Sequence, residues 1–346
     1  MHQRPSAFLI AVVSAMAFAR IVSAQGPDTE VRIRLESTDG SRLSGALVAL
    51  VDSTGRVITE GVSGEDARRV LHAPAGSYRV RVRRIGFLPF LSEPVSLPRT
   101  SELALSVESQ RVQLQTIVVT SRSACGPIDP EDRVLSALWD EIAKALRTSQ
   151  LSPKDLADFS QAFVYRKTLR ANGTVVSSDT VFRPIGTNRP FGVVNPAVLS
   201  TVGYVVGNER LGWTYYAPDE AVLLSDQFAS THCFQVVREK GRAGQIGIEF
   251  RPIPRRSVPD IGGVLWVDES SAELRELSFR YVNAGPLERF RAGGFARFRR
   301  VPSGSWIVDD WAIVGPILER SRDPYSELKV TGYVEDGGGM KMRPKQ

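Results

Sequence analysis

Polar and apolar residues alternate along two short stretches in the first third of the chain. Val31, Ile33 and Leu35 alternate with arginine and glutamate, and the same alternation recurs in residues 78–83. A repeat of two residues is typical of a β-strand with one buried face. Turn residues separate these stretches at short intervals, so residues 25–121 are predicted to form an antiparallel β-sandwich.

A helical pattern follows a linker predicted at residues 122–130. Its apolar residues recur every three to four positions, at Leu135, Leu138, Ile142 and Leu146. This spacing predicts an amphipathic helix that runs from Asp129, as its N-cap, to about Arg147. We expect its apolar face to pack against the strands that follow.

Strand patterns dominate the rest of the chain. Residues 163–183 are predicted to form a hairpin, because Asn172-Gly173 favours a tight type I′ turn between two extended runs. Further strands are predicted at 233–238, 245–251, 263–268, 274–282, 294–301, 306–314 and 328–334. Residues 131–336 are therefore expected to form one helix and a curved antiparallel sheet, and residues 337–346 a flexible basic tail. The predicted fold class is mainly β.

The first residues resemble a secretory signal peptide. The apolar run at residues 7–19 is shorter than the ~20 residues that a membrane-spanning helix needs. Val22-Ser23-Ala24 favours cleavage before Gln25, which makes residues 1–24 the signal peptide, and Ala17-Phe18-Ala19 offers an alternative site before Arg20. No later window predicts a transmembrane segment. We expect an exported protein, in the periplasm, associated with the outer membrane, or secreted.

Two cysteines, Cys125 and Cys233, enter an oxidising compartment if the chain is exported. A disulfide between them is predicted, and in the simplest chain-entropy model it stabilises the fold by roughly 4 to 5 kcal/mol. The alternative is two unrelated buried thiols.

Composition narrows the class of protein. The chain has 346 residues, of which 42% are hydrophobic and 24% charged, so it can bury a core and is long enough for two domains. Its net charge of +6 is small for this length. Export, together with the near balance of positive and negative charges, argues against a nucleic-acid partner.

Residues from Gly45 to Phe90 resemble the carboxypeptidase regulatory-like family, which has a transthyretin-like β-sandwich. The matching motifs are Gly45-Ala46-x-Val48, the turn at residues 52–55, Gly76-Ser77-Tyr78 and Arg84-Ile85-Gly86-Phe87. The resemblance implies a non-catalytic unit that accompanies enzymes and outer-membrane receptors. Residues 262–283 resemble a hairpin of the half-open barrels of periplasmic lipoprotein carriers, which implies a curved sheet with an apolar concave side.

No complete catalytic or metal-binding pattern is present in the sequence. A zinc carboxypeptidase needs two histidines and a glutamate, and the sequence has no His-x-x-Glu motif. Any Ser-His triad would have to use His72 or His232, because His2 lies in the predicted signal peptide. We therefore expect no catalytic residue, no cofactor and no bound metal.

Acidic residues leave a glycoside hydrolase as a lesser alternative. Asp309-Asp310, Asp268-Glu269 and Asp260 are the candidate carboxyl groups. The simpler interpretation is that residues 268–271 form a turn and that Asp309-Asp310 mark a β-bulge.

Aromatic residues offer one candidate ligand-binding segment. Trp213, Tyr215 and Tyr216 can contact a lipid or a sugar, although such residues more often belong to the core. The leading hypothesis is a non-enzymatic cell-envelope protein that binds or scaffolds, with an envelope or outer-membrane protein, a lipid or a glycan as partner. The alternative, a carrier or binder of lipid or glycan, predicts a groove of at least several hundred Å³ near Trp213.

Overall fold

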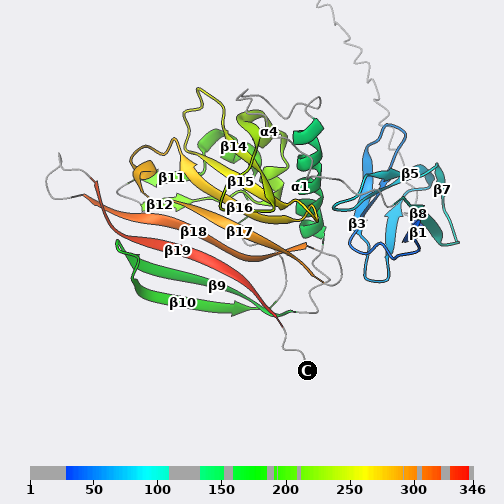
Figure 1. Cartoon of the computed structure of the whole chain (residues 1–346), viewed down its shortest axis with the longest axis horizontal. Coiled ribbons are helices and arrows are strands. Elements are labelled where there is room, and N and C mark those ends of the chain that lie inside the picture. Colours follow the sequence, from blue (N-terminus) through cyan, green and yellow to red (C-terminus); the bar gives the residue numbers. More distant parts are fainter. Residues whose placement is uncertain are drawn as a thin grey trace, which may run out of the picture.

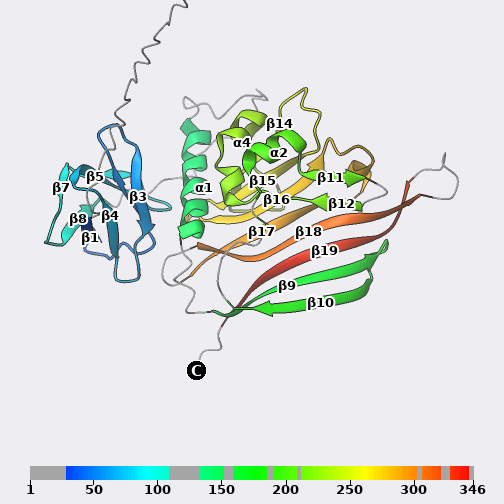
Figure 2. The ribbon, with the colours of Figure 1, turned by 180° about the vertical axis from the view of Figure 1, so that it is seen from behind.

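A computed structural model describes most of the chain after the predicted signal peptide. The described residues are 29–108, 133–151, 159–184, 191–192, 194–208, 212–290, 292–301, 306–320 and 328–342. Their fold is mainly β, as predicted. Figures 1 and 2 show the strands β1–β8 on one side of helix α1 and a large curved sheet on its other side. Each side has its own hydrophobic core.

The first body is a β-sandwich of two sheets. One sheet has the order β4-β1-β8, and the other has the order β3-β2-β5-β6, with β7 also pairing with β5. The strands are β1 (Thr29–Ser37), β2 (Leu47–Val51), β3 (Val57–Val62), β4 (Arg68–Ala73), β5 (Gly76–Arg83), β6 (Phe90–Leu91), β7 (Val95–Leu97) and β8 (Leu103–Val107). The predicted alternation is confirmed, since Val31, Ile33 and Leu35 are fully buried. The sandwich is not wholly antiparallel, because β8 pairs with β1 in parallel.

Helix α1 (Arg133–Leu151) ends four residues later than predicted, and its predicted N-cap at Asp129 lies outside the described residues. The predicted apolar stripe is confirmed, because Leu135, Leu138, Ile142 and Leu146 are all buried in the core of the second body. The opposite face is not fully solvated, since Glu141 and Lys144 are each 1% exposed. The helix therefore packs on both sides.

The large sheet has nine strands in the order β10-β9-β19-β18-β17-β16-β15-β14-β13, all antiparallel. Its strands are β9 (Phe159–Arg170), β10 (Val175–Arg183), β13 (His232–Val237), β14 (Gln245–Pro252), β15 (Asp260–Asp268), β16 (Leu274–Val282), β17 (Gly293–Arg300), β18 (Trp306–Arg320) and β19 (Leu328–Met342). The predicted meander is confirmed from β13 to β19. The β9–β10 hairpin extends it beyond β19, so the first hairpin of this body pairs with its last strand (Figure 1).

The hairpin turn differs from the predicted type I′. Such a turn requires positive φ at both central residues, but only Gly173, at φ 87°, has it. The Gly173 amide donates to Arg170 O, and the Arg170 amide donates to Thr174 O. This is the pattern of a type I turn followed by a glycine bulge.

The predicted flexible tail is wrong for residues 337–342, which belong to β19. Gly337, Gly338 and Gly339 pair with β18 on one side and β9 on the other. A Cβ at Gly337 would overlap the ring of Tyr165, and one at Gly338 would lie 3.0 Å from the indole nitrogen of Trp311. The glycines are therefore the sites where aromatic rings from neighbouring strands lie against the backbone.

Short elements cover one face of the large sheet, and the sequence patterns did not predict them. They are α2 (Pro196–Val202), α3 (Glu220–Leu223), α4 (Asp226–Thr231), the 3-10 helix η1 (Gly285–Arg289), and a hairpin of β11 (Val205–Asn208) and β12 (Gly212–Tyr215). Side chains of Asn195, Asp219 and Ser225 accept from the first turns of the three α-helices. Within the described residues, no helix has the length and apolar character to cross a membrane.

Candidate functional site

A groove of about 470 Å³ lies between the β11–β12 hairpin and strands β18, β19 and β9. Its walls are Trp213, Thr214 and Tyr215 from β12, Ile313 and residues 315–318 from β18, Val334 and Asp336 from β19, and Arg166 from β9. Figure 2 shows β12 beside β18, with β19 and then β9 next in the sheet. The register places Ile313 opposite Asp336 and Gly315 opposite Val334, so these residues share one face of the sheet.

Two of the three predicted ligand-contacting aromatics, Trp213 and Tyr215, line this groove. Tyr216 does not line it; its carbonyl accepts from the hydroxyl of Tyr281 at 3.0 Å, and its ring packs against the core. Trp213 and Tyr215 belong to β12, which forms the wall of the groove, whereas Tyr216 lies beyond the end of this strand.

The floor of the groove depends on a glycine. A Cβ at Gly315 would overlap the ring of Tyr215, so this ring lies directly on the backbone of β18. Burial raises the pKa of Tyr215 to about 12, and its hydroxyl is therefore neutral at physiological pH. The Tyr215 ring also packs against Tyr281, with 5.3 Å between ring centroids.

Among the described residues that line the groove, the charged side chains are those of one ion pair. Arg166 Nε donates to Asp336 Oδ1 at 2.6 Å, and Arg166 Nη2 donates to Asp336 Oδ2 at 2.8 Å. The hydrogen bond and the charge of Asp336 raise the pKa of Arg166. The other walls are aromatic, aliphatic or glycine, apart from Thr214. The groove thus combines aromatic and aliphatic walls with a polar edge, where the Arg166–Asp336 pair is exposed to solvent.

A second polar arrangement joins the sandwich to helix α1. Glu141 Oε2 accepts from the Gly86 amide at 2.6 Å, and Glu141 Oε1 accepts from Lys144 Nζ at 2.7 Å. Lys144 Nζ also donates to Phe87 O at 3.0 Å and pairs with Asp140 at 2.9 Å. Burial raises the pKa of Glu141, and the positive charge of Lys144 opposes this rise. We call Glu141, Lys144 and the main chain of residues 86–87 the interface clasp.

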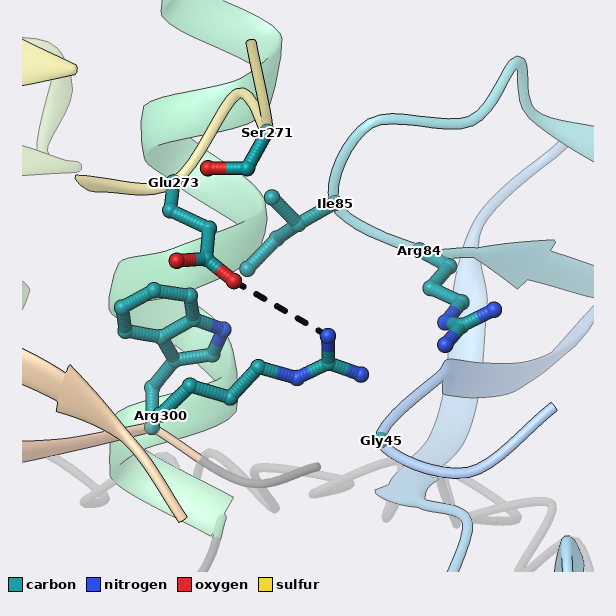
Figure 3. Close-up of a pocket in the computed structure, with 7 residues that line it drawn as sticks. Gly45, Arg84, Ile85, Ser271, Glu273 and Arg300 are labelled. Atoms are coloured by element: carbon teal, nitrogen blue, oxygen red, sulfur yellow. Dashed lines mark ion pairs between the residues drawn. The ribbon is translucent and has the colours of Figure 1, made fainter. Parts of the chain in front are cut away.

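The clasp gives a structural role to the Arg84-Ile85-Gly86-Phe87 motif. Ile85 packs against the core of the second body, and Gly86 has a φ of 79°. Figure 3 shows this loop facing Ser271, Glu273 and Arg300 across a small pocket. The pocket has a volume of about 20 Å³, which holds no more than about one water molecule. It is therefore a packing gap of the interface and not a ligand site.

His232 has an acid and a hydroxyl beside it, but it lies in the core. Its Nε2 is 3.2 Å from Asp260 Oδ1, and its Nδ1 is 3.1 Å from Thr231 Oγ1. The side chain is 1% exposed and its ring stacks on Phe228. Arg256 also pairs with Asp260. The cluster joins β13, β15 and the end of α4, which is a structural role. His72 is exposed on β4.

The candidate carboxyl groups for sugar hydrolysis are each used in local structure. Asp309 pairs with Arg299 and Asp310 with Arg297, and the predicted bulge is confirmed where the register of β17 and β18 shifts. Burial alone would raise the pKa of Asp268, but hydrogen bonds from Ser270 and Ser271 outweigh it and lower the pKa to about 2.

The remaining site predictions concern cysteines and metals. Cys233 is buried on β13, while Cys125 lies outside the described residues, so their disulfide stays a prediction. Across the part of the chain that the structure describes, no three His, Cys, Asp or Glu side chains are grouped to hold a metal ion.

Sequence reasoning missed most of the groove and all of the clasp. Arg166, Gly315 and Asp336 come from three strands that lie far apart in the chain. The clasp had a weak signal, since Glu141 and Lys144 stand three residues apart in the helix, a spacing that suits an ion pair.

No protein-family model and no curated protein matches this chain. Among solved structures, it is similar to a DUF3823 family protein from Bacteroides ovatus, at 7% identity over 65% of this chain and 91% of that one, with a TM-score of 0.19. It is also similar to the Bacillus anthracis TIE protein, at 8% identity over 75% of this chain and 46% of that one, with a TM-score of 0.21. A third is the major pilin subunit of Bacillus cereus, at 9% identity over 89% and 95%, with a TM-score of 0.21. Scores this low carry no argument about this chain.

Proposed function

We propose that this chain is an exported cell-envelope protein that binds an elongated apolar ligand in the groove beside Trp213. The observation that carries the proposal is the groove itself, whose volume of about 470 Å³ falls within the roughly 300–1,000 Å³ of small-molecule sites. It lies where the sequence predicted a groove for a lipid or glycan carrier.

The lining favours an acyl chain over a sugar. Ile313, Pro316, Ile317, Leu318 and Val334 offer aliphatic surface along β18 and β19. A sugar needs several convergent hydrogen-bonding groups for its hydroxyls, but the two charged side chains among the described groove residues bond to each other.

A non-enzymatic role is part of the proposal. Among the described groove residues, none is a histidine, a cysteine or a serine. Tyr215, whose pKa is about 12, is poorly suited to transfer a proton at neutral pH. Binding through shape is the activity that these side chains support.

Export and the disulfide complete the proposal. We propose that residues 1–24 are a cleaved signal peptide, that the mature chain is in the periplasm, at the outer membrane or outside the cell, and that Cys125 and Cys233 form a disulfide there. We also propose that the N-terminal β-sandwich is a carboxypeptidase regulatory-like module, which the motifs between Gly45 and Phe90 support. Mass spectrometry of the non-reduced mature protein tests both the cleavage site and the bridge.

The groove is tested by filling it. Val334 faces Gly315 across β18 and β19, and Val334→Trp places a large ring in the space. Tetradecane binding, followed by the fluorescence of the mature protein, is expected to weaken by about tenfold or more. The control is Val175→Trp on the exposed strand β10, outside the groove. Equal binding by both variants and the parent protein, or no binding by the parent, refutes the proposed function.

A further inference from the structure

One border of the large sheet is an exposed strand. Strand β10 stands at the end of the strand order, and among the described strands it pairs with β9 alone. Figure 1 shows β10 as the outermost strand of the sheet, and all nine of its residues are exposed. An edge strand presents unpaired main-chain N–H and C=O groups, to which a further strand can be added. Strand β10 is therefore the free border of this sheet.

The side chains of β10 do little to protect this border. Lysine and proline are common protecting residues of edge strands, but β10 has the sequence VVSSDTVFR, with neither of them. Its register shift lies between Val175 and Ser177, so residues 177–183 pair regularly with β9. In that regular stretch Val181 and Phe182, which point to opposite faces, are 54% and 53% exposed. Such a strand is suited to pair with another strand.

The two charged residues of β10 indicate which strand that is. Asp179 and Arg183 lie four residues apart, on the same face of the strand. When two β10 strands pair antiparallel about Val181, Asp179 of each copy lies opposite Arg183 of the other, which is favourable. Centring the pair one residue earlier loses these contacts, and centring it two residues earlier places the two Asp179 side chains opposite each other. Within one chain, Arg166 lies opposite Asp179 but pairs with Asp336.

The same register gathers apolar side chains at the centre of the contact. The two Val181 side chains face each other, and each Phe182 lies opposite Thr180 of the other copy. The two Phe182 rings are then diagonal neighbours, a position from which aromatic side chains reach each other. Phe182 already packs against Phe163 of β9, with 6.4 Å between ring centroids, so the aromatic contacts would continue from one sheet into the other. An apolar centre with a charged rim is typical of protein interfaces.

We propose that two copies of this protein pair through β10, antiparallel and centred on Val181, so that their two nine-stranded sheets become one continuous sheet. Both copies use the same surface, and a two-fold contact of this kind closes at two copies. Residues 179–183 of each copy form the contact, which is small, so a weak and concentration-dependent dimer is expected. None of the described groove residues belongs to β10, so the dimer does not depend on the proposed function.

Analytical ultracentrifugation of the mature full-length protein, at concentrations up to several hundred micromolar, measures the dimer. Val181→Lys places two like charges opposite each other at the centre and is expected to weaken the dimer by about tenfold. Val175→Lys is the matched control, because it changes the same residue type on the same strand, at 51% exposure, outside residues 179–183. A parent protein that stays monomeric refutes the proposal, and so does a dimer that Val181→Lys weakens no more than Val175→Lys.

Charge reversal tests the register. Asp179→Arg and Arg183→Asp each place like charges opposite each other, so each variant alone is expected to dimerise more weakly than the parent. In a mixture of the two variants both positions carry opposite charges again, and a heterodimer should form. If both variants keep the circular dichroism of the parent and their mixture does not recover the dimer, the pairing about Val181 is wrong. If either variant loses that signal, the comparison of Val181→Lys with Val175→Lys still decides the proposal.

Discussion

Replacing Lys144 by methionine is expected to destabilise the protein more than the loss of a single exposed ion pair would. Lys144 is 1% exposed and its ammonium group contacts Glu141, Asp140 and the carbonyl of Phe87. Methionine keeps much of the side-chain volume and removes the charge. Glu141, also 1% exposed, is then left with the Gly86 amide as its hydrogen-bond donor among the contacts of the clasp.

The magnitude follows from the cost of an unpaired buried charge. Removing one partner of a buried ion pair costs about 3–5 kcal/mol, whereas replacing both partners together is often close to neutral. For a body of this size, the single variant should therefore melt about 6–20 °C below the parent. Lys144→Met combined with Glu141→Gln should recover most of this loss, because the glutamine oxygen still accepts from Gly86.

Urea and thermal unfolding of the mature chain measure the effect, with Lys167→Met as the matched control. Lys167 pairs with Glu335 at 3.0 Å but is one-third exposed, so its loss should cost no more than about 1 kcal/mol. If Lys144→Met is as mild as Lys167→Met, the clasp does not stabilise the fold as argued.

The pH dependence gives an independent check. Burial raises the folded-state pKa of Glu141 above its unfolded value, so its contribution to stability is greatest below the unfolded pKa and falls as the pH rises through the folded pKa. Without Lys144, which opposes this rise, the pKa goes higher still. The stability gap between Lys144→Met and the parent should therefore narrow as the pH is lowered from neutral; a gap that widens contradicts the assignment.

Three further outcomes are expected. Gly86→Ala should destabilise the protein more than Gly55→Ala. Both glycines have positive φ, which costs alanine about 1–2 kcal/mol, but of these two positions Gly86 is the one where the new Cβ meets a carbonyl oxygen, that of Ser271 at 3.1 Å. Equal losses of stability in urea unfolding would argue against this tight contact. Asp268→Asn should remove a stabilisation that is present above the unfolded pKa and lost as the pH falls through about 2, so parent and variant melting temperatures should converge in strong acid. Trp306→Ala, at a side chain 1% exposed, should cost about 3–5 kcal/mol, and a loss below 1 kcal/mol would show that the core there is loosely packed.

Local patterns in the sequence were enough to predict most of the regular structure. The alternation at residues 31–35, the stripe from Leu135 to Leu146 and the strand patterns from residue 233 onward each describe one element with one buried face. Periodicity reports on a single element, because it records which side chains turn the same way. The segment of Trp213 and Tyr215 was found by its aromatic residues, while the strand that holds them was not predicted.

Tertiary structure alone decided which elements meet. Helix α1 has a second buried face because the sandwich lies against it, and the clasp forms where Gly86 reaches Glu141. The three glycines of β19 look like a flexible tail in isolation, yet rings from β9 and β18 pack on them within the sheet. The groove likewise needs Arg166, Gly315 and Val334 brought together by a register that no local pattern contains. The pairing of distant strands depends on which residues of both strands become buried together, and a pattern within one strand does not contain that information.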